Sequence, residues 1–156
     1  MVTRTEDVQL IFSTIAQYRR WVAAEIPGIV PDTDVSYQQI NVLYLVRTAN
    51  ASMADMARAL NVAPTVITGL VDRLETRGLI SRQPHPTDRR RVQLVLTERG
   101  NEISQQVEEA VSARINEQIA KLSPSDQQKL REGLRLLQSV TAQLEQSVES
   151  TGAPSE

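Results

Sequence analysis

The sequence contains no cysteine, one histidine and few aromatic side chains. Without cysteine the chain can form no disulfide, no thiolate metal site and no thiol redox sensor. One histidine alone offers too few ligands for zinc, so we expect neither a metal nor a cofactor and interpret His85 as a surface imidazole. A Gly-rich phosphate loop and the G-x-S-x-G turn of serine hydrolases are also missing, so we do not expect an enzyme.

Long apolar runs are missing as well. No run approaches the roughly 20 residues that a membrane-spanning helix needs. The N-terminus, MVTRTED, carries acidic residues where a secretory signal would carry an apolar segment. The sequence therefore predicts a cytoplasmic protein that does not contact a membrane.

The chain lacks a net positive charge, but its basic residues are concentrated in one segment. The net charge is −2, yet residues 72–99 hold seven arginines and four acidic residues. Such a cluster is typical of a phosphate-binding surface, although a solvated charged hairpin would have the same composition. The choice between the two depends on the elements that carry the arginines.

Helical periodicity predicts most of the chain. Apolar residues at helical spacing indicate a first helix over residues 1–24, broken by the prolines and glycine at 27–31. Capping patterns at Ser36 and Ser52 predict the next two helices, and Pro64 suits the first position of a fourth, which should end at Gly78. Further helices are expected after Thr97 and after Ser123.

A change of period after Gly78 predicts a hairpin. Residues 79–82 and 92–96 read as two strands, joined by a proline-rich connection with arginines. Helix, short helix, turn, helix and hairpin in this order define a winged helix-turn-helix within a mainly α (α+β) fold. We expect a dimerisation helix and loop over 1–35, a DNA-binding lobe over 36–99, dimerisation helices over 100–149 and a disordered tail over 150–156.

The fourth helix is the candidate recognition helix. One face is apolar and should pack on the lobe, which leaves the other free for the major groove. Small hydroxyl side chains on that face could reach base edges, and an arginine further along could contact a phosphate. The candidate DNA-binding residues of the two helices are Ser52, Pro64, Thr65, Thr68, Gly69 and Arg73.

Three stretches resemble the MarR family of transcriptional regulators: MADMARALNV at 53–62, VDRLETRGLI at 71–80 and PTDRRRVQLVLTERG at 86–100. The resemblance implies that Asp88 of the wing holds Arg90 for insertion into the minor groove. Arg89 and Arg91 would contact phosphates. Two positions depart from the family pattern: Ala63 replaces a capping serine, and Gly69 replaces a frequent arginine.

Aromatic and leucine residues at the two ends of the chain are candidates for binding sites outside the lobe. The aromatic residues fit core packing between helices, which we favour, or, as the resemblance implies, an effector pocket: Phe12, Tyr18, Trp21 and Tyr44. The leucines fit packing within one subunit or a dimer interface, which we favour: Leu130, Leu134, Leu137 and Leu144.

These observations predict a sequence-specific DNA-binding regulator. We expect a homodimer on a pseudo-palindromic site in double-stranded DNA, acting as a repressor that a small aromatic effector releases. The alternative is a winged-helix module that binds another protein and no DNA. The arginines argue against it, because protein interfaces are depleted of charge at their centre.

Overall fold

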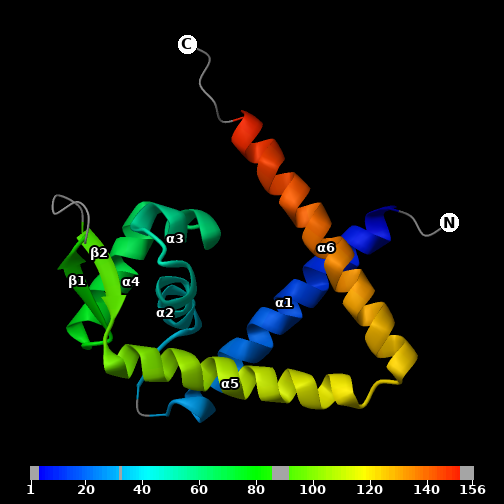
Figure 1. Cartoon of the computed structure of the whole chain (residues 1–156), viewed down its shortest axis with the longest axis horizontal. Helices are drawn as coiled ribbons and strands as arrows, with labels where there is room; N and C mark the ends of the chain where they lie inside the picture. The colour runs from blue at the N-terminus through cyan, green and yellow to red at the C-terminus, as the bar shows by residue number, and fades with distance from the viewer. Residues whose placement is uncertain (1–3, 32, 86–91, 152–156) are drawn as a thin grey trace. The chain divides into compact units, whose positions relative to one another are not determined.

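The computed structural model describes residues 4–31, 33–85 and 92–151 (Figure 1). In chain order the elements are α1 (Arg4–Ile29), α2 (Tyr37–Ala49), α3 (Met53–Ala59), α4 (Pro64–Thr76), β1 (Ile80–Pro84), β2 (Val92–Leu96), α5 (Glu98–Ala120) and α6 (Pro124–Thr151). They form two compact units, one ending at Ser112 and the other starting at Ala113. The mostly helical chain with a two-stranded antiparallel sheet confirms the predicted fold class.

The first helix is longer than the sequence predicted. Helix α1 continues through Pro27 to Ile29, although proline has no N–H to donate within a helix. Val22, Ile26 and Val30 recur every four residues and are all buried, so the end of α1 carries one apolar stripe against the lobe. Burial of that stripe offsets the local cost of Pro27, which a reading of helix breakers alone does not capture.

Capping interactions begin α2 and α3 as predicted. Ser36 accepts a hydrogen bond from the backbone N–H of Gln39, and the Gln39 side chain accepts one from the Ser36 N–H. Ser52 and Asp55 form the same reciprocal pair at the start of α3. Asn61, at a φ of 49°, makes the turn that leads toward α4.

The core of the first unit lies between α2, α4, the hairpin and the first turns of α5. Helix α4 contacts α2, α3 and β1, and β2 contacts α2. Figure 1 shows these elements gathered together. The most deeply buried side chains include Val42, Leu43, Met56, Ile67, Val71, Leu74, Leu79 and Ile80.

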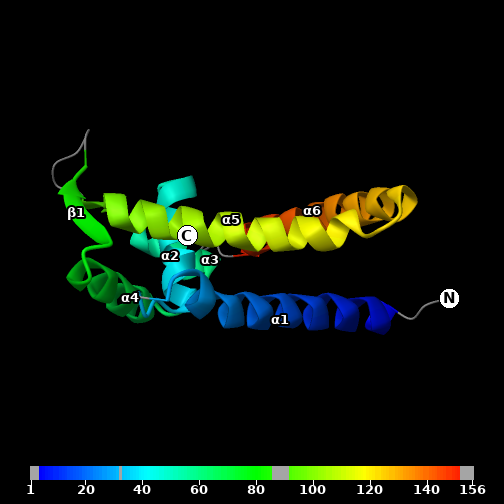
Figure 2. The same cartoon turned by 90° about the horizontal axis from the view of Figure 1, so that it is seen from below.

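The base of the hairpin is bonded to both α4 and α5. β1 and β2 pair in an antiparallel register from Ile80↔Leu96 to Pro84↔Val92. Thr97 Oγ1 donates to the carbonyl of Gly78 at 2.7 Å, and the Thr97 N–H donates to the carbonyl of Leu79 at 3.1 Å. The Gly100 N–H in turn donates to Thr97 Oγ1 at 3.0 Å, which confirms the predicted cap of α5. Helix α5 therefore starts directly beside the hairpin (Figure 2).

The second unit consists of the remainder of α5 and α6. Ser123 accepts a hydrogen bond from the Asp126 N–H at 3.1 Å and so caps α6. Helix α6 extends to Thr151, two residues beyond the predicted end at 149, and the predicted disordered tail otherwise lies outside the described residues. Within the described chain, none of the helices combines the length and apolar character that crossing a membrane requires.

Candidate nucleic-acid interface

Helix α4 has one buried and one exposed face, as the recognition-helix prediction requires. Pro64 occupies the first turn, and the N-cap residue Ala63 makes no side-chain capping bond. The buried face consists of Ile67, Leu70, Val71 and Leu74. Burial of these four residues fixes the rotation of the helix, so the opposite face is presented to solvent.

The exposed face carries the residues that the sequence predicted. Pro64, Thr65, Thr68 and Arg73 are exposed, and Gly69 is half-buried. Thr68 Oγ1 donates to the carbonyl of Pro64 at 3.1 Å, so its oxygen remains able to accept a further hydrogen bond. Arg73 Nε donates to the carbonyl of Gly69 at 3.0 Å, which places the guanidinium along the outer face of the helix.

Ser52 lies exposed at the start of α3, but its donors are already used. Its hydroxyl donates to Asp55 Oδ2 at 2.6 Å, and its N–H donates to the same oxygen at 3.1 Å. These hydrogen bonds hold the pKa of Asp55 below its usual value. A phosphate contact by Ser52 would therefore require it to exchange the Asp55 carboxylate for the phosphate.

Two arginines of the basic segment are bound within the protein. Arg77 Nη1 donates to the backbone carbonyls of Thr33 and Asp34, at 3.3 and 2.6 Å, and Nη2 donates to the Asp34 carboxylate. Arg82 Nη2 donates to Asp72 Oδ1 at 2.6 Å, and Nη1 donates to Glu75. The bond to Asp72, followed by the attraction of Glu75, raises the pKa of Arg82 despite partial desolvation. Periodicity alone had not assigned partners to either arginine, since each bonds to a segment other than its own.

The predicted wing residues Asp88, Arg89, Arg90 and Arg91 lie outside the described residues. The structure does describe the strands that lead to and from them. β1 ends at Pro84 and β2 begins at Val92, and these two residues are paired in the antiparallel register. The roles of the four wing residues accordingly remain predictions from the sequence.

Three of the four candidate pocket aromatics are exposed in the single chain, and the fourth is half-buried. Phe12, Tyr18 and Tyr44 retain 68%, 46% and 43% of their accessible surface, and Trp21 is half-buried. Tyr18 and Trp21 pack against each other with ring centroids 6.1 Å apart. Partial burial, with nearby Tyr37 and Tyr44, raises the pKa of Tyr18 above its usual value. The exposures of Phe12, Tyr18 and Tyr44 contradict the favoured interpretation of core packing within one chain, whereas the half-buried Trp21 does not.

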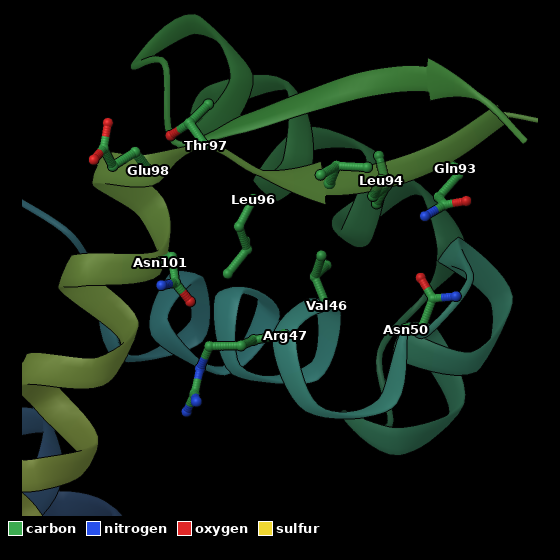
Figure 3. A pocket seen from close by; sticks show the side chains of 10 residues that line it. Val46, Arg47, Asn50, Gln93, Leu94, Leu96, Thr97, Glu98 and Asn101 are labelled. Carbon is green, nitrogen blue, oxygen red and sulfur yellow. The ribbon is translucent and has the colours of Figure 1, made fainter. Parts of the chain in front are cut away.

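The lobe has a separate pocket with a volume of about 380 Å³ (Figure 3). It lies between the end of α2, strand β2 and the start of α5, and its wall contains none of the four aromatics. Val46, Leu94 and Leu96 supply apolar surface, and Asn50 and Asn101 supply amides. Sequence reasoning missed this site, because its residues come from three elements and no motif links them.

The candidate dimer residues on α6 are also largely uncovered. Leu130, Leu134 and Leu144 keep 38%, 52% and 59% of their surface, while Leu137 is half-buried. Isolated exposed leucines are common, but a row of them along one helix is typical of a surface that another protein covers. Among the described residues, no group of three histidine, aspartate or glutamate side chains comes together to hold a metal.

A three-helix lobe with an exposed α4 face, followed by a hairpin, defines a winged helix-turn-helix protein. A sequence model of the MarR family matches residues 35–92, the span from the start of α2 to the start of β2.

Curated relatives and a solved structure agree with this match. The chain is 32% identical over 105 residues to the uncharacterised HTH-type transcriptional regulator YfiV of Bacillus subtilis, covering 67% of this chain and 66% of the relative. It is 28% identical over 95 residues to the multiple antibiotic resistance protein MarR of Escherichia coli, covering 60% and 66%. The transcriptional regulator BldR of Sulfolobus solfataricus is 28% identical with a TM-score of 0.65, covering 89% and 99%. The chain belongs to the MarR family of transcriptional regulators.

Proposed function

We propose that this protein binds double-stranded DNA sequence-specifically and represses transcription as a homodimer. The observation that carries the proposal is the exposed face of α4 from Pro64 to Arg73, opposite a fully buried face. An α-helix held this way fits the major groove, where each base pair presents a distinct pattern of hydrogen-bonding groups.

The exposed residues divide into two kinds of contact. Thr65 and Thr68 are short and lie in the N-terminal half of α4, so they suit base edges and thymine methyl groups. Arg73 lies further along the helix and suits a phosphate. The wing arginines Arg89 and Arg91 would add phosphate contacts, and Arg90, held by Asp88, would enter the minor groove.

A homodimer would supply the second half of the interface. The uncovered leucines of α6, Leu130, Leu134, Leu137 and Leu144, suit a symmetric contact with a second copy of the chain. Two recognition helices related by a two-fold axis would then read a pseudo-palindromic DNA site.

The aromatics of α1 and α2 support the proposal of a small-molecule effector. Tyr18 and Trp21 pack at a tilt near the exposed Tyr44, and the group offers apolar rings and two phenolic hydroxyls. A small aromatic ligand there would favour one spacing of the two lobes and so weaken DNA binding. Phe12 would contribute a further apolar side chain from α1.

An electrophoretic mobility shift with the DNA upstream of the protein's own gene tests the proposed function. We expect a shifted band that unlabelled upstream DNA displaces and a scrambled duplex of equal length does not. The affinity should fall as salt rises, because phosphate contacts release bound cations. If neither the upstream DNA nor a random-sequence pool yields a selectively bound duplex, the protein-binding alternative replaces the proposal.

A further inference from the structure

Arg82 joins the hairpin to the recognition helix through two carboxylates. It lies in the middle of β1, and its two terminal nitrogens bond separately to Asp72 and Glu75, which are three residues apart on α4. The Nη2–Oδ1 distance to Asp72 is 2.6 Å. A guanidinium suits this task because its planar fork has donors in fixed directions.

This contact lies where β1 itself is no longer buried, opposite Leu94 of β2, which is 7% exposed. Ile80 is 2% exposed, but burial declines along β1, and residues 82–84 are exposed. Packing therefore holds the start of β1 and, through Leu94, the middle of β2, whereas the side chains in the outer half of β1 are not packed. The outer half is joined to α4 by the two bonds of Arg82.

The contact also changes the charge of the face that DNA would approach. Asp72 and Glu75 place two negative charges on α4 on either side of Arg73. Unpaired, they would repel phosphates, since carboxylates close to DNA oppose its binding. Paired with Arg82, they contribute one net negative charge instead of two.

We infer that Arg82 is a positioning residue for DNA recognition, which sets the separation between α4 and the wing. The inference rests on the proposed function, because it concerns which base pairs the helix and the wing read together. Its effect lies in geometry more than in fold stability, since ion pairs exposed to this extent stabilise proteins only slightly.

A direct phosphate contact by Arg82 is the competing role, and the two roles predict opposite signs for the acidic residues. If Arg82 contacts DNA, Asp72→Asn with Glu75→Gln releases it, removes repulsion and strengthens binding. If Arg82 positions the hairpin, the same double variant removes the anchor points and weakens binding, although it makes the protein less negative.

The experiment uses the full-length protein and a duplex that the wild-type protein selects from a random-sequence pool. We expect Arg82→Gln to lower affinity about tenfold, a size typical of coupled contacts. Asp72→Asn with Glu75→Gln should cause a similar loss, and combining all three substitutions should add nothing further. For Arg82→Gln, the slope of log affinity against log salt should equal that of the wild-type protein. Loss of a phosphate contact would instead lower the slope by about one unit.

A second measurement reports the separation between the hairpin and α4 and does not depend on the stability of the fold. One base pair is inserted between the central bases of a half-site and its flank, and the affinity ratio of the original to the altered duplex is measured. This ratio should fall in Arg82→Gln and recover partly in Arg82→Lys, because an ammonium can still bond one carboxylate.

Matched controls separate position from charge. Glu98→Gln with Glu102→Gln removes two exposed carboxylates from the first turns of α5, and Arg135→Gln removes one positive charge from α6. We expect neither to change the affinity ratio. Circular dichroism below the melting temperature checks that every variant is folded.

Three results would overturn the inference. Tighter binding by the Asp72 and Glu75 double variant, with a reduced salt slope in Arg82→Gln, would make Arg82 a phosphate contact. An Arg82→Gln protein with unchanged affinity and ratio would leave Arg82 without a role in recognition, while the proposed function stands. Failure of the wild-type protein to select any duplex would remove the proposed function and the inference together.

Discussion

Gly100 has the least room for a side chain among the described glycines. A Cβ added there would lie 2.0 Å from the carbonyl oxygen of Leu79 and 2.9 Å from its carbonyl carbon. Both atoms belong to the backbone, which is bonded to Thr97 and cannot turn away as a flexible side chain would. A glycine at this position lets the first turn of α5 lie directly against the backbone of Leu79, between α4 and β1.

We expect Gly100→Ala to destabilise the protein by about 1–3 kcal/mol or more, since overpacking against a fixed neighbour costs this amount. Thermal unfolding measures the change. Gly133→Ala on α6 is the matched control, because its Cβ would meet nothing within 4 Å. Alanine is the better helix former, so the control should gain up to about 1 kcal/mol. Equal stability of both variants would contradict the close approach.

For Asp88, we predict that its removal changes DNA affinity in the direction opposite to that expected for an acidic residue. Removal of an acidic side chain near DNA ordinarily strengthens binding. If Asp88 holds Arg90, Asp88→Ala should instead weaken it, and Arg90→Ala should cost about 1–3 kcal/mol of binding free energy. Fluorescence anisotropy at fixed salt measures both, with Arg91→Ala as a variant expected to lower the salt slope by about one unit. Tighter binding by Asp88→Ala would exclude the positioning role.

At the scale of the elements, the two helices of the helix-turn-helix begin differently. α3 has a reciprocal cap made by Ser52 and Asp55, whereas Ala63 at the start of α4 offers no side-chain acceptor. Ala63 already has the extended backbone conformation of a capping residue, with φ of −62° and ψ of 146°. A hydroxyl could therefore be added there without moving the backbone.

We expect Ala63→Ser to stabilise the protein by about 0.5–2 kcal/mol, and Ser52→Ala to destabilise it by a comparable amount, since these are typical values for a helix cap. Chemical denaturation with urea measures both free energies of unfolding. The pair is informative because the two substitutions are chemical opposites at equivalent positions. Destabilisation by both substitutions would contradict the prediction for α4, and stabilisation by both would contradict the one for α3.

The sequence predicted those features of the helices and strands that follow from the local pattern of apolar and polar residues. The apolar residues Ile67, Leu70, Val71 and Leu74 repeat with helical period, and the structure confirms their burial. Pro27 shows where this reasoning ends: local propensity predicted a break, but burial of Ile26 and Val30 carries α1 further.

The candidate site divides in the same way. The exposed face of α4 follows from periodicity, so Thr65, Thr68 and Arg73 could be identified beforehand. The bonds of Arg82 to Asp72 and Glu75 could not, because they depend on how a strand lies across a helix. The spacing of residues along the sequence does not say how β1 lies across α4.

For the whole molecule, the exposed leucines predict a dimer. Light scattering at micromolar concentration should give about twice the chain mass of 17.4 kDa. Leu137→Glu should weaken both dimerisation and DNA binding, because it places a charge in an apolar contact. Leu144→Glu should do the same with less effect on the single chain, since Leu144 is 59% exposed there.

Gln146→Glu is the control, because this exposed residue lies on the side of the same helix away from the leucines, and it should leave the mass unchanged. A wild-type protein that scatters as a monomer at these concentrations would remove the interface and with it the pseudo-palindromic site.

The effector proposal gives a prediction at the same scale. Phenolic compounds that bind near Tyr18 and Tyr44 should quench the fluorescence of Trp21, the only tryptophan, and lower DNA affinity over the same concentration range. Tyr44→Ala should weaken both effects together. A broad phenolic panel that produces no quenching would remove the support for this pocket.

Peroxide should leave DNA binding unchanged unless a methionine is oxidised, since the chain has no cysteine.

The bonds at the base of the hairpin have a consequence for how such a protein can diverge. Thr97 closes the segment that begins at Gly78, so the hairpin leaves the lobe from a fixed point that does not depend on its tip. Substitutions and insertions between Pro84 and Val92 therefore need not be accommodated by the recognition helix or by α5. If the tip contacts DNA as proposed, we expect its DNA preference to change through such substitutions without a matching change in the fold of the lobe.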